Sequence, residues 1–223
     1  MELLIVIAMI AILIGIGYPT FISILEKARK TQAANEEQQI VTAVNGYYTD
    51  YGNYPVDVPG GNTTDAYFGS GTAPAGSTSY GTNDRLFDVL RDNTLSANTS
   101  ANACPGTNLV TCLNPRATVY IQPPISKTGT KAGIDSRTGS PTVGIWFDPF
   151  GSPYNVMIDE TYNNQLTNPY TDVPGGTTLY LGVVVWSFGK NGRLGGGAPA
   201  AGFTSENGTA NNFTNSSDVI SWQ

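Results

Sequence analysis

One long uncharged apolar segment constrains the fold of this chain more than any other feature. It runs over Leu3–Leu25, 23 residues without a charged side chain. A helix rises ~1.5 Å per residue, so this segment is long enough to cross a hydrocarbon layer ~30 Å thick. Its apolar residues surround the helix on every side, as a helix enclosed by lipid or by protein requires. We therefore expect residues 1–25 to form a transmembrane or filament-core helix.

A cleaved secretory signal and a plain membrane anchor are the competing interpretations of this segment. A secretory signal begins with positive charge and ends in a small-residue cleavage site, whereas Glu2 precedes this segment and Glu26 and Lys27 follow it. An anchor has no use for a carboxylate at the start of its apolar run, where burial is costly. The anchor is the stronger of the two alternatives.

The helix is expected to continue as an amphipathic helix over residues 26–54. Residues 26–51 are rich in helix-forming residues and contain no proline. Gly52 and Pro55 then end the helix. Apolar residues recur at helical spacing and form one stripe along it: Ile40, Val44, Tyr47, Tyr48 and Tyr51.

Residues 55–223 are predicted to form a β head with long loops. The composition turns to Gly, Thr, Ser, Asn and Pro, and residues 57–83 are typical of a long loop. A short helix is expected over Arg85–Arg91, with Asn83 as its cap, and Asp148–Gly151 suits a type I turn between two strands. The fold class is therefore α+β, a long helix packed on a small antiparallel sheet. Strands are expected at Ala117–Gln122, Val143–Phe147, Asn155–Ile158 and Leu179–Phe188.

The composition argues against an enzyme and against nucleic-acid binding. The chain has no histidine, which removes the commonest general base and every Ser-His or Cys-His pair. Its formal net charge is −6, with only 11 basic residues to neutralise phosphates. A membrane-tethered hydrolase that uses the carboxylates of Asp148, Asp159 and Glu160 is a weaker alternative, and a membrane-anchored extracytoplasmic binding module is another.

The two cysteines, Cys104 and Cys112, are predicted to form a disulfide. They lie close together in sequence rich in Ser, Asn and Thr, which is typical of a bond in an oxidising compartment rather than of a redox or metal site. A pair of free thiols is the alternative.

Several segments resemble the type IV pilins and the type II secretion pseudopilins. In ELLIVIAMIAILIGIGYP, Glu2 opens the apolar segment and Pro19 follows, as in these families. YYTDYGNYPVD (Tyr47–Asp57) resembles the passage from helix to head in secretion-type pseudopilins. Three later segments are similar, in order, to the D-P-W-G-N-P-Y motif, the S-L-G-A-D-G loop and the closing D-I-x-x-W of the major, G-type pseudopilin: Asp148–Tyr154, Val185–Gly192 and Ser217–Trp222.

The resemblance implies a structural subunit that polymerises into a helical filament through its N-terminal helix. It implies three kinds of partner: copies of the same chain, the bacterial inner membrane before assembly, and the pilus or secretion assembly machinery. The finished filament would be periplasmic or extracellular. Three residues are expected to serve assembly. Glu2 would pair with the free α-amine of a neighbouring subunit, while Gly17 and Pro19 would loosen the helix and produce a kink or local melting around Gly15–Pro19.

The resemblance also implies a calcium ion in the head. It places the calcium loop of the family at Ser187–Gly197, completed by Asp218, with Asn191 as a second side-chain ligand. The family usually has an aspartate where Asn191 stands, so less charge and lower affinity are expected. A metal-free loop held by hydrogen bonds is the alternative.

The position of Glu2 departs from the family pattern. There the glutamate is the fifth residue of the mature chain, behind a short basic leader. We expect three mature residues and the leader to precede this sequence. The basic residues Lys27, Arg29 and Lys30 alone would place the head in the cytoplasm, and only such a leader would reverse that orientation.

Overall fold

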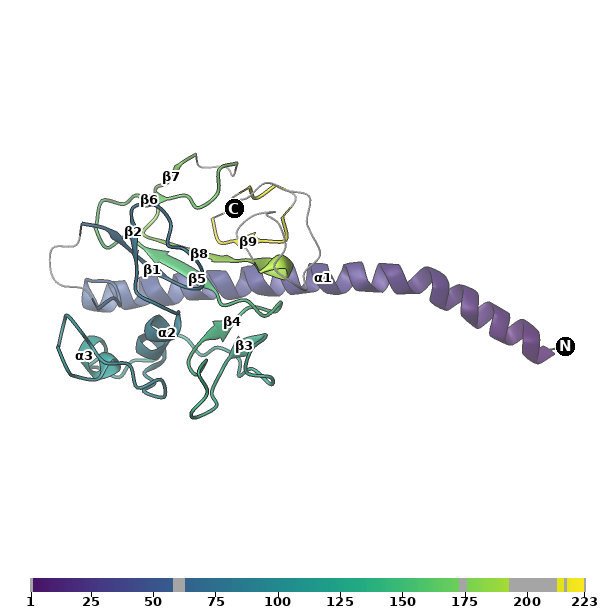
Figure 1. The fold of residues 1–223 in the computed structure, drawn as a ribbon, viewed down its shortest axis with the longest axis horizontal. Helices are drawn as coiled ribbons and strands as arrows, with labels where there is room; N and C mark the ends of the chain where they lie inside the picture. Colours follow the sequence, from purple (N-terminus) through teal and green to yellow (C-terminus); the bar gives the residue numbers. More distant parts are fainter. Residues whose placement is uncertain (1, 58–62, 173–175, 193–211, 215, 223) are drawn as a thin grey trace.

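A single helix, α1 (Glu2–Tyr51), carries a head domain on its C-terminal half (Figure 1). The structure is a computed structural model that describes residues 2–57, 63–172, 176–192, 212–214 and 216–222, without the side chains of residues 2, 4, 8 and 14–20. A kink or local melting was predicted around residues 15–19. The helix is continuous there, so it does not melt, and it bends in its N-terminal third. It ends where expected, because Gly52 takes a positive φ of 74° and donates its N–H to the Tyr48 carbonyl at 2.8 Å.

A five-stranded sheet packs against this C-terminal half of α1. The predicted α+β class fits, but the sheet is mixed rather than antiparallel, because β1 pairs with β2 in parallel while the other pairs are antiparallel. The segment that links β1 to β2 returns the chain in the same direction, so the edge strand cannot form a hairpin. The strand order is β2 (Ser77–Ser79), β1 (Asp65–Phe68), β5 (Asn155–Ile158), β8 (Val183–Ser187) and β9 (Val219–Ile220).

The two faces of the sheet are covered by different elements. On one face Phe68, Val156 and Val185 join a core with Ile40 and Val44 of α1. On the other face a second cluster forms beneath the hairpin of β6 (Leu166–Thr167) and β7 (Thr178–Leu179), and it contains Tyr67, Met157, Val184 and Trp186. Because both faces are covered, every residue of β1, β5 and β8 is buried, which explains the continuous apolar runs of β5 and β8.

A smaller lobe packs beside the sheet and below α1 in Figure 1. It holds α2 (Asp84–Arg91), α3 (Leu109–Leu113), and the paired strands β3 (Gly133–Ile134) and β4 (Trp146–Phe147). The 3₁₀ helix η1 (Gly189–Asn191) follows β8.

Asn83 ties this lobe together rather than capping α2. Its amide nitrogen donates to the carbonyls of Trp146 and Tyr154 at 3.0 and 2.8 Å, and its oxygen accepts the Trp146 N–H at 3.0 Å. The side chain is fully buried and makes no capping bond to α2. Asn83 occupies the predicted N-cap position of α2, but its side chain does not cap the helix, because three buried backbone groups of Trp146 and Tyr154 bind it instead.

Two of the expected strands do not form as predicted. Residues 117–122 form no strand, because the Asn114 side chain binds Thr118 at both its N–H and its carbonyl and leaves that segment outside a ladder. Within Val143–Phe147 only Trp146–Phe147 is a strand, since Gly144 takes a positive φ of 84°.

The other predicted elements are largely present. Asn155–Ile158 forms β5 as expected, and Leu179–Phe188 divides into β7 and β8 around Gly182. The predicted turn is confirmed by the bond from the Gly151 N–H to the Asp148 carbonyl at 3.2 Å. The segment 57–83, expected to be loop, contains β1 and β2.

The disulfide between Cys104 and Cys112 is confirmed and closes the loop that leads into α3. The same loop is bound to the segment after α1 by Asp57, which accepts hydrogen bonds from the Ser100 hydroxyl at 2.8 Å and the N–H groups of Ala101 and Ala103 at 2.6 and 2.8 Å. Burial would raise the pKa of Asp57, but these hydrogen bonds outweigh it and hold the pKa below its ordinary value.

Removal of the disulfide is expected to lower the stability of the head. A loop with a sequence separation of 8 corresponds to about 2–3 kcal/mol by the chain-entropy argument. The variant Cys104→Ser/Cys112→Ser, unfolded with urea in mild detergent, should lose this amount. Reduced wild-type protein serves as the control and should behave like the variant. Equal stability of variant and wild type would show that Asp57 alone holds the loop.

Candidate functional site: the exposed half of α1 and its junction with the head

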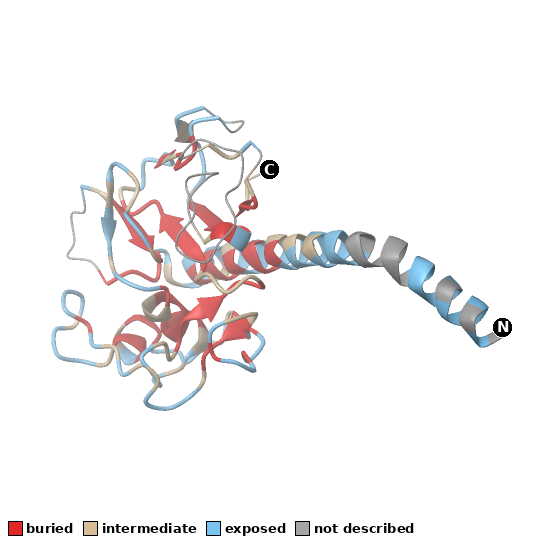
Figure 2. Cartoon of the chain, turned by 45° about the vertical axis from the view of Figure 1, so that its right-hand side comes forward, coloured by how far each residue is buried: buried red, intermediate tan, exposed pale blue. Residues whose placement is uncertain are grey.

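Helix α1 divides into a docked half and a protruding half (Figure 2). The docked half buries residues at helical spacing against the sheet, among them Ala33, Ile40, Val44 and Tyr47. Of the predicted apolar stripe, Tyr48 is the exception, since it is 38% exposed and stacks on Tyr54 with ring centroids 4.6 Å apart. The amphipathic part is therefore the part that anchors the head.

The protruding half exposes large apolar side chains on both described stretches, residues 3–13 and 21–25. Isolated exposed apolar residues are ordinary, but a contiguous surface of them marks an interaction site. Among the residues that the structure describes, no helix combines the length and apolarity needed to cross a membrane. Twelve such side chains of this segment are exposed: Leu3, Ile5, Val6, Ile7, Met9, Ile10, Ile12, Leu13, Phe21, Ile22, Ile24 and Leu25.

The three predicted assembly residues lie on this half of α1. The backbone of Glu2, Gly17 and Pro19 belongs to the helix, but their side chains are outside the described part of the structure. The predicted pairing of Glu2 with a neighbouring α-amine therefore stays a prediction.

A cluster of buried carboxyl groups lies where the docked half of α1 meets the sheet. Glu36 is satisfied, because it accepts the Tyr154 hydroxyl at 2.6 Å and the Gln32 amide at 2.8 Å. Glu37 is fully buried, and neither of its oxygens has a hydrogen-bond partner in the described chain. Burial raises the pKa of Glu37 well above its ordinary value, and the facing Asp148 raises it further.

Asp148 is the best-bonded member of this cluster. It accepts the N–H groups of Phe150, Gly151 and Ser152 at 2.8, 2.6 and 2.8 Å, together with the Ser187 hydroxyl. Burial still raises its pKa to about 6. These bonds join the turn after β4 to the end of β8, so Asp148 orders this end of the head.

The predicted calcium residues are brought close to each other. The Asn191 N–H donates to the Ser217 hydroxyl at 3.3 Å, next to Asp218. Asp218 accepts the Tyr170 hydroxyl at 2.6 Å. Within the described residues no group of three or more acidic or cysteine side chains is placed to hold a metal ion, and residues 193–197 of the expected loop lie outside them. Calcium binding at Asn191 and Asp218 therefore stays a prediction.

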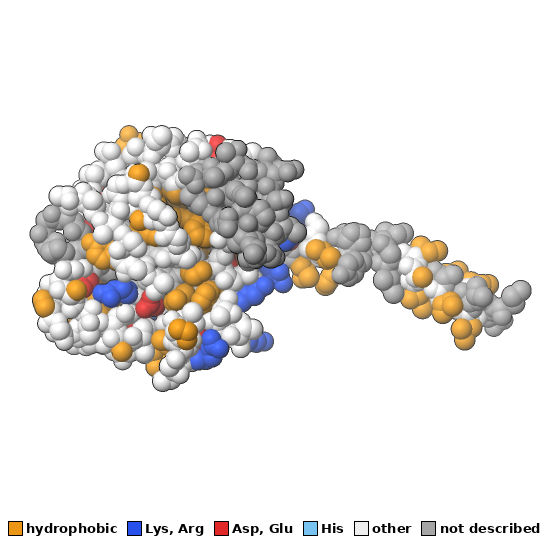
Figure 3. Space-filling model, viewed as in Figure 1, with side chains coloured by type: hydrophobic (Ala, Val, Ile, Leu, Met, Phe, Trp, Pro, Cys, Tyr) orange, Lys and Arg blue, Asp and Glu red, His pale blue; other side chains and the backbone are white. Residues whose placement is uncertain are grey.

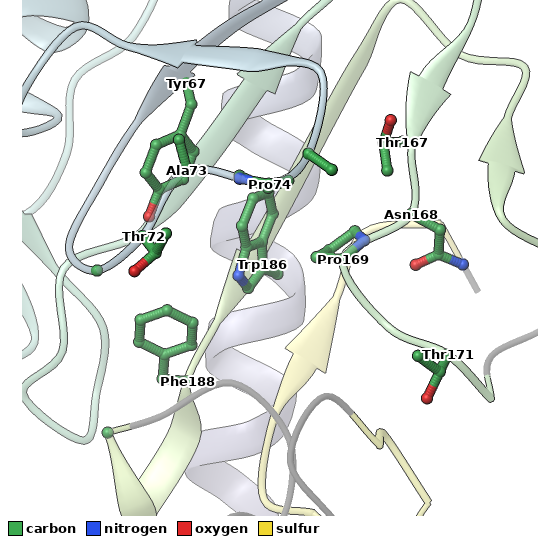
Figure 4. Close-up of a pocket in the computed structure, with 13 residues that line it drawn as sticks. Tyr67, Thr72, Ala73, Pro74, Thr167, Asn168, Pro169, Thr171, Trp186 and Phe188 are labelled. Carbon is green, nitrogen blue, oxygen red and sulfur yellow. The ribbon is translucent and has the colours of Figure 1, made fainter.

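The head contains a cavity of about 530 Å³ on the face of the sheet opposite α1. Tyr67, Trp186 and Phe188 line it from β1 and the end of β8, and Asn168 and Thr171 line it from the segment after β6 (Figure 4). The volume is in the range of small-molecule sites. No acidic side chain is among its lining residues, so the carboxylates considered for hydrolysis do not face it.

Asp159 and Glu160 lie at a turn after β5. Asp159 accepts the N–H groups of Asn163 and Asn164 at 3.3 and 2.6 Å and the Thr161 hydroxyl at 2.9 Å. Burial raises the pKa of Glu160 to about 7, with the neighbouring Asp159 adding to the shift. Both carboxyl groups are buried.

The sequence interpretation missed the two glutamates at the junction. Glu36 and Glu37 stand one helical turn before Ile40 and two before Val44, so they share the buried face of the stripe. That spacing was the available signal, because a charged residue on an apolar face requires a partner or a raised pKa.

Comparison with known proteins gives no relative from which a function can be taken. No protein-family model, no curated protein and no solved structure matches the chain. The exposed apolar half of α1 and the fold of the head on its docked half are therefore the main basis for a functional assignment.

Proposed function

We propose that this chain is a structural subunit of a type IV pilus-like or type II secretion pseudopilus-like filament. The observation that carries the proposal is the exposed apolar half of α1, whose twelve exposed large side chains have no partner surface within the described chain. Such a surface is unfavourable in water and favours a membrane or a bundle of like helices. The resemblance of the Glu2–Pro19 segment to pilins supports the bundle.

In this proposal the subunit has two environments in turn. Before assembly the apolar half lies in the bacterial inner membrane, and the assembly machinery then transfers it into a periplasmic or extracellular filament. There the helices of many subunits pack side by side while the heads form the outer surface. A bundle of this kind buries the apolar surface without lipid.

Glu2 sets the register of the proposed bundle. An ionised carboxylate inside an apolar bundle is costly unless a positive group pairs with it. The α-amine of a neighbouring subunit would supply that charge, and only one axial stagger brings the two groups together. The bend of α1 in its N-terminal third is compatible with packing in a helical array.

The cavity of the head supports a second candidate, a membrane-anchored binding module. Its aromatic wall of Tyr67, Trp186 and Phe188 and its polar groups are of the kind that bind small molecules. Electron microscopy of native cell-surface material separates the candidates, because a filament subunit gives fibres and a binding module gives separate membrane-bound heads.

Replacement of Glu2 tests the filament mechanism. Glu2→Ala removes the carboxylate that fixes the stagger, so we expect the variant to reach the membrane at the wild-type level but to form few or no filaments. Glu2→Asp is the matched control, because it keeps the charge on a shorter side chain and should retain part of the assembly. Normal filaments from Glu2→Ala would disprove the pairing mechanism but not the filament assignment.

A further inference from the structure

The formal net charge does not describe the surface of the head. The full sequence has 17 acidic residues, and ten of those that the structure describes are buried, whereas none of the described lysines and arginines is. Burial withdraws those carboxylates from solvent and from approaching partners. The exposed surface is therefore more basic than the sequence count of −6 suggests.

Basic side chains gather at the end of the head from which α1 protrudes (Figure 3). We call this set the basic collar. All its members are exposed or partly exposed. The collar consists of Lys27, Arg29 and Lys30 on α1, Lys190 on η1, and Lys127 and Lys131 on the loop before β3.

Polar contacts hold the collar residues of α1 close to Lys190 on η1. The Lys30 ammonium donates to the Ser216 carbonyl at 3.2 Å, and the Lys190 ammonium pairs with Glu26 at 3.4 Å. The Ser217 hydroxyl accepts the Lys190 N–H at 2.8 Å. The helix turn just after the apolar segment is thus bound to η1 and to the segment before β9.

A second chain of contacts places the loop before β3 at the same end. The Ala132 N–H donates to the Asp148 carbonyl at 2.8 Å, and the Asp148 carboxylate accepts the Ser187 hydroxyl. Ser187 in turn accepts the Gly189 N–H at 2.9 Å, next to Lys190. Figure 1 likewise shows β3 and η1 at the end of the head nearest the protruding helix.

The exposed part of the loop before β3 carries an apolar side chain close to a basic one. Ile125 is 67% exposed and stands two residues before Lys127. Exposure of a large apolar side chain to water is unfavourable. At a lipid interface the apolar side chain can contact the acyl chains while the neighbouring lysine contacts the headgroups. The loop therefore carries both groups that such an interface accepts.

We propose that the basic collar is a lipid-headgroup surface that seats the head on an anionic bilayer. This inference rests on the proposed membrane stage of the filament subunit. The collar follows Ile22, Ile24 and Leu25 directly, so a bilayer that encloses the apolar half of α1 brings its headgroups to the level of Lys27. Each lysine or arginine near such a surface strengthens association roughly fivefold.

Fluorescence of a labelled collar loop tests this inference. Both native cysteines are in the disulfide, so Thr128→Cys supplies a single thiol for an environment-sensitive dye. The full chain is reconstituted into vesicles of phosphatidylcholine alone, or of phosphatidylcholine mixed with phosphatidylglycerol. We expect a blue-shifted, stronger emission on the anionic vesicles only, lost at high salt because the interaction is screened.

Two charge reversals, one within the collar and one outside it, show whether the emission change depends on the collar. Lys127→Glu should abolish the emission change. Arg116→Glu should keep it, because Arg116 is exposed at the far end of α1, with its guanidinium 5.2 Å from the Tyr51 ring centroid. The two ends are about 35 Å apart along the helix.

The remaining outcomes overturn the inference. Equal emission on neutral and anionic vesicles would show that the collar does not bind headgroups. A change that grows with protein density on both kinds of vesicle would assign the collar to contact between copies of the chain. Filament formation is scored separately, so the membrane contact and the filament assignment can fail independently.

Discussion

The variant Ile12→Asp is expected to abolish filament formation without altering the head. Ile12 is 61% exposed on the protruding half of α1, more than five helical turns before the buried Ala33 of the docked half. In the proposed bundle this position is enclosed by neighbouring helices, where a carboxylate without a partner costs several kcal/mol in every subunit. Since a polymer repeats that cost at each interface, assembly should fall below detection. Negative-stain electron microscopy of material sheared from cells measures the result.

Two controls separate loss of assembly from loss of the protein. Val119→Asp introduces the same charge at a side chain of the head that is 46% exposed, and it should leave filaments unchanged. Ile24→Asp lies near the end of the apolar segment at 58% exposure, where the carboxylate can reach headgroups in the membrane. It should therefore reach the membrane fraction at the wild-type level and still fail to assemble.

Normal filaments from Ile12→Asp would show that the apolar half of α1 is not the assembly surface. The chain would then still form filaments, but through another surface, and the apolar half of α1 would serve only as an anchor. Ile12→Asp could be scarce in the membrane fraction while Ile24→Asp is present at the normal level. The defect of Ile12→Asp would then be one of membrane insertion, and filament formation by Ile24→Asp would show whether the apolar half of α1 is the assembly surface.

The sequence predicted α1 well because several independent signals agreed along it. The uncharged run, the apolar stripe and the Gly52 stop each specify a helix, and the observed helix ends at Tyr51. The strands β5 and β8 were predictable because both faces are covered and their residues are continuously apolar.

The missed elements were set by tertiary contacts that leave little trace in the local sequence. Strand β1 has only four residues, DAYF, between Gly- and Thr-rich segments, and its place between β5 and β2 depends on distant partners. Asn83 and Asp57 resemble ordinary loop residues, yet each accepts or donates several bonds across the fold. Local propensity cannot reveal which distant backbone groups need a partner.

Some features of the candidate site were predicted from the sequence, whereas the buried glutamates at the junction were not. The apolar segment identified the protruding half of α1, and the cysteine spacing identified the disulfide. The burial of Glu37 was not predicted, because the stripe was traced through apolar residues only. Its consequence for stability is large.

Glu37→Gln is expected to stabilise the protein at neutral pH. The Glu37 carboxyl is fully buried and faces Asp148 and Asp218, with Glu36 beside it. Burial raises its pKa well above the ordinary value of 4.5, and the charge of Asp148 adds to the shift. Above pH 4.5 the unfolded chain ionises this carboxyl while the folded protein resists its ionisation, so folding is penalised increasingly as the pH rises. Glutamine has the same shape and carries no such cost.

The pH dependence follows from the direction of this shift. The folded state keeps a proton that the unfolded chain releases, so the stability that protonated Glu37 contributes is fully present below pH 4.5 and is lost as the pH rises toward the pKa of the folded state. Asp148 and Glu160, with pKa values raised to about 6 and about 7, act in the same direction. Wild-type stability should therefore decline between about pH 4.5 and pH 7, and Glu37→Gln should flatten this decline.

Urea unfolding in mild detergent at pH 4.5 and at pH 8 measures both effects. Glu37→Gln should match wild type at the lower pH and have a higher free energy of unfolding than wild type at the higher pH. Its neighbour provides the control, because Glu36 accepts hydrogen bonds from Tyr154 and Gln32. Glu36→Gln turns one of those acceptors into a donor and should destabilise by about 1–3 kcal/mol. If Glu37→Gln instead lowers stability at pH 8, the native carboxyl is ionised and held by a cation.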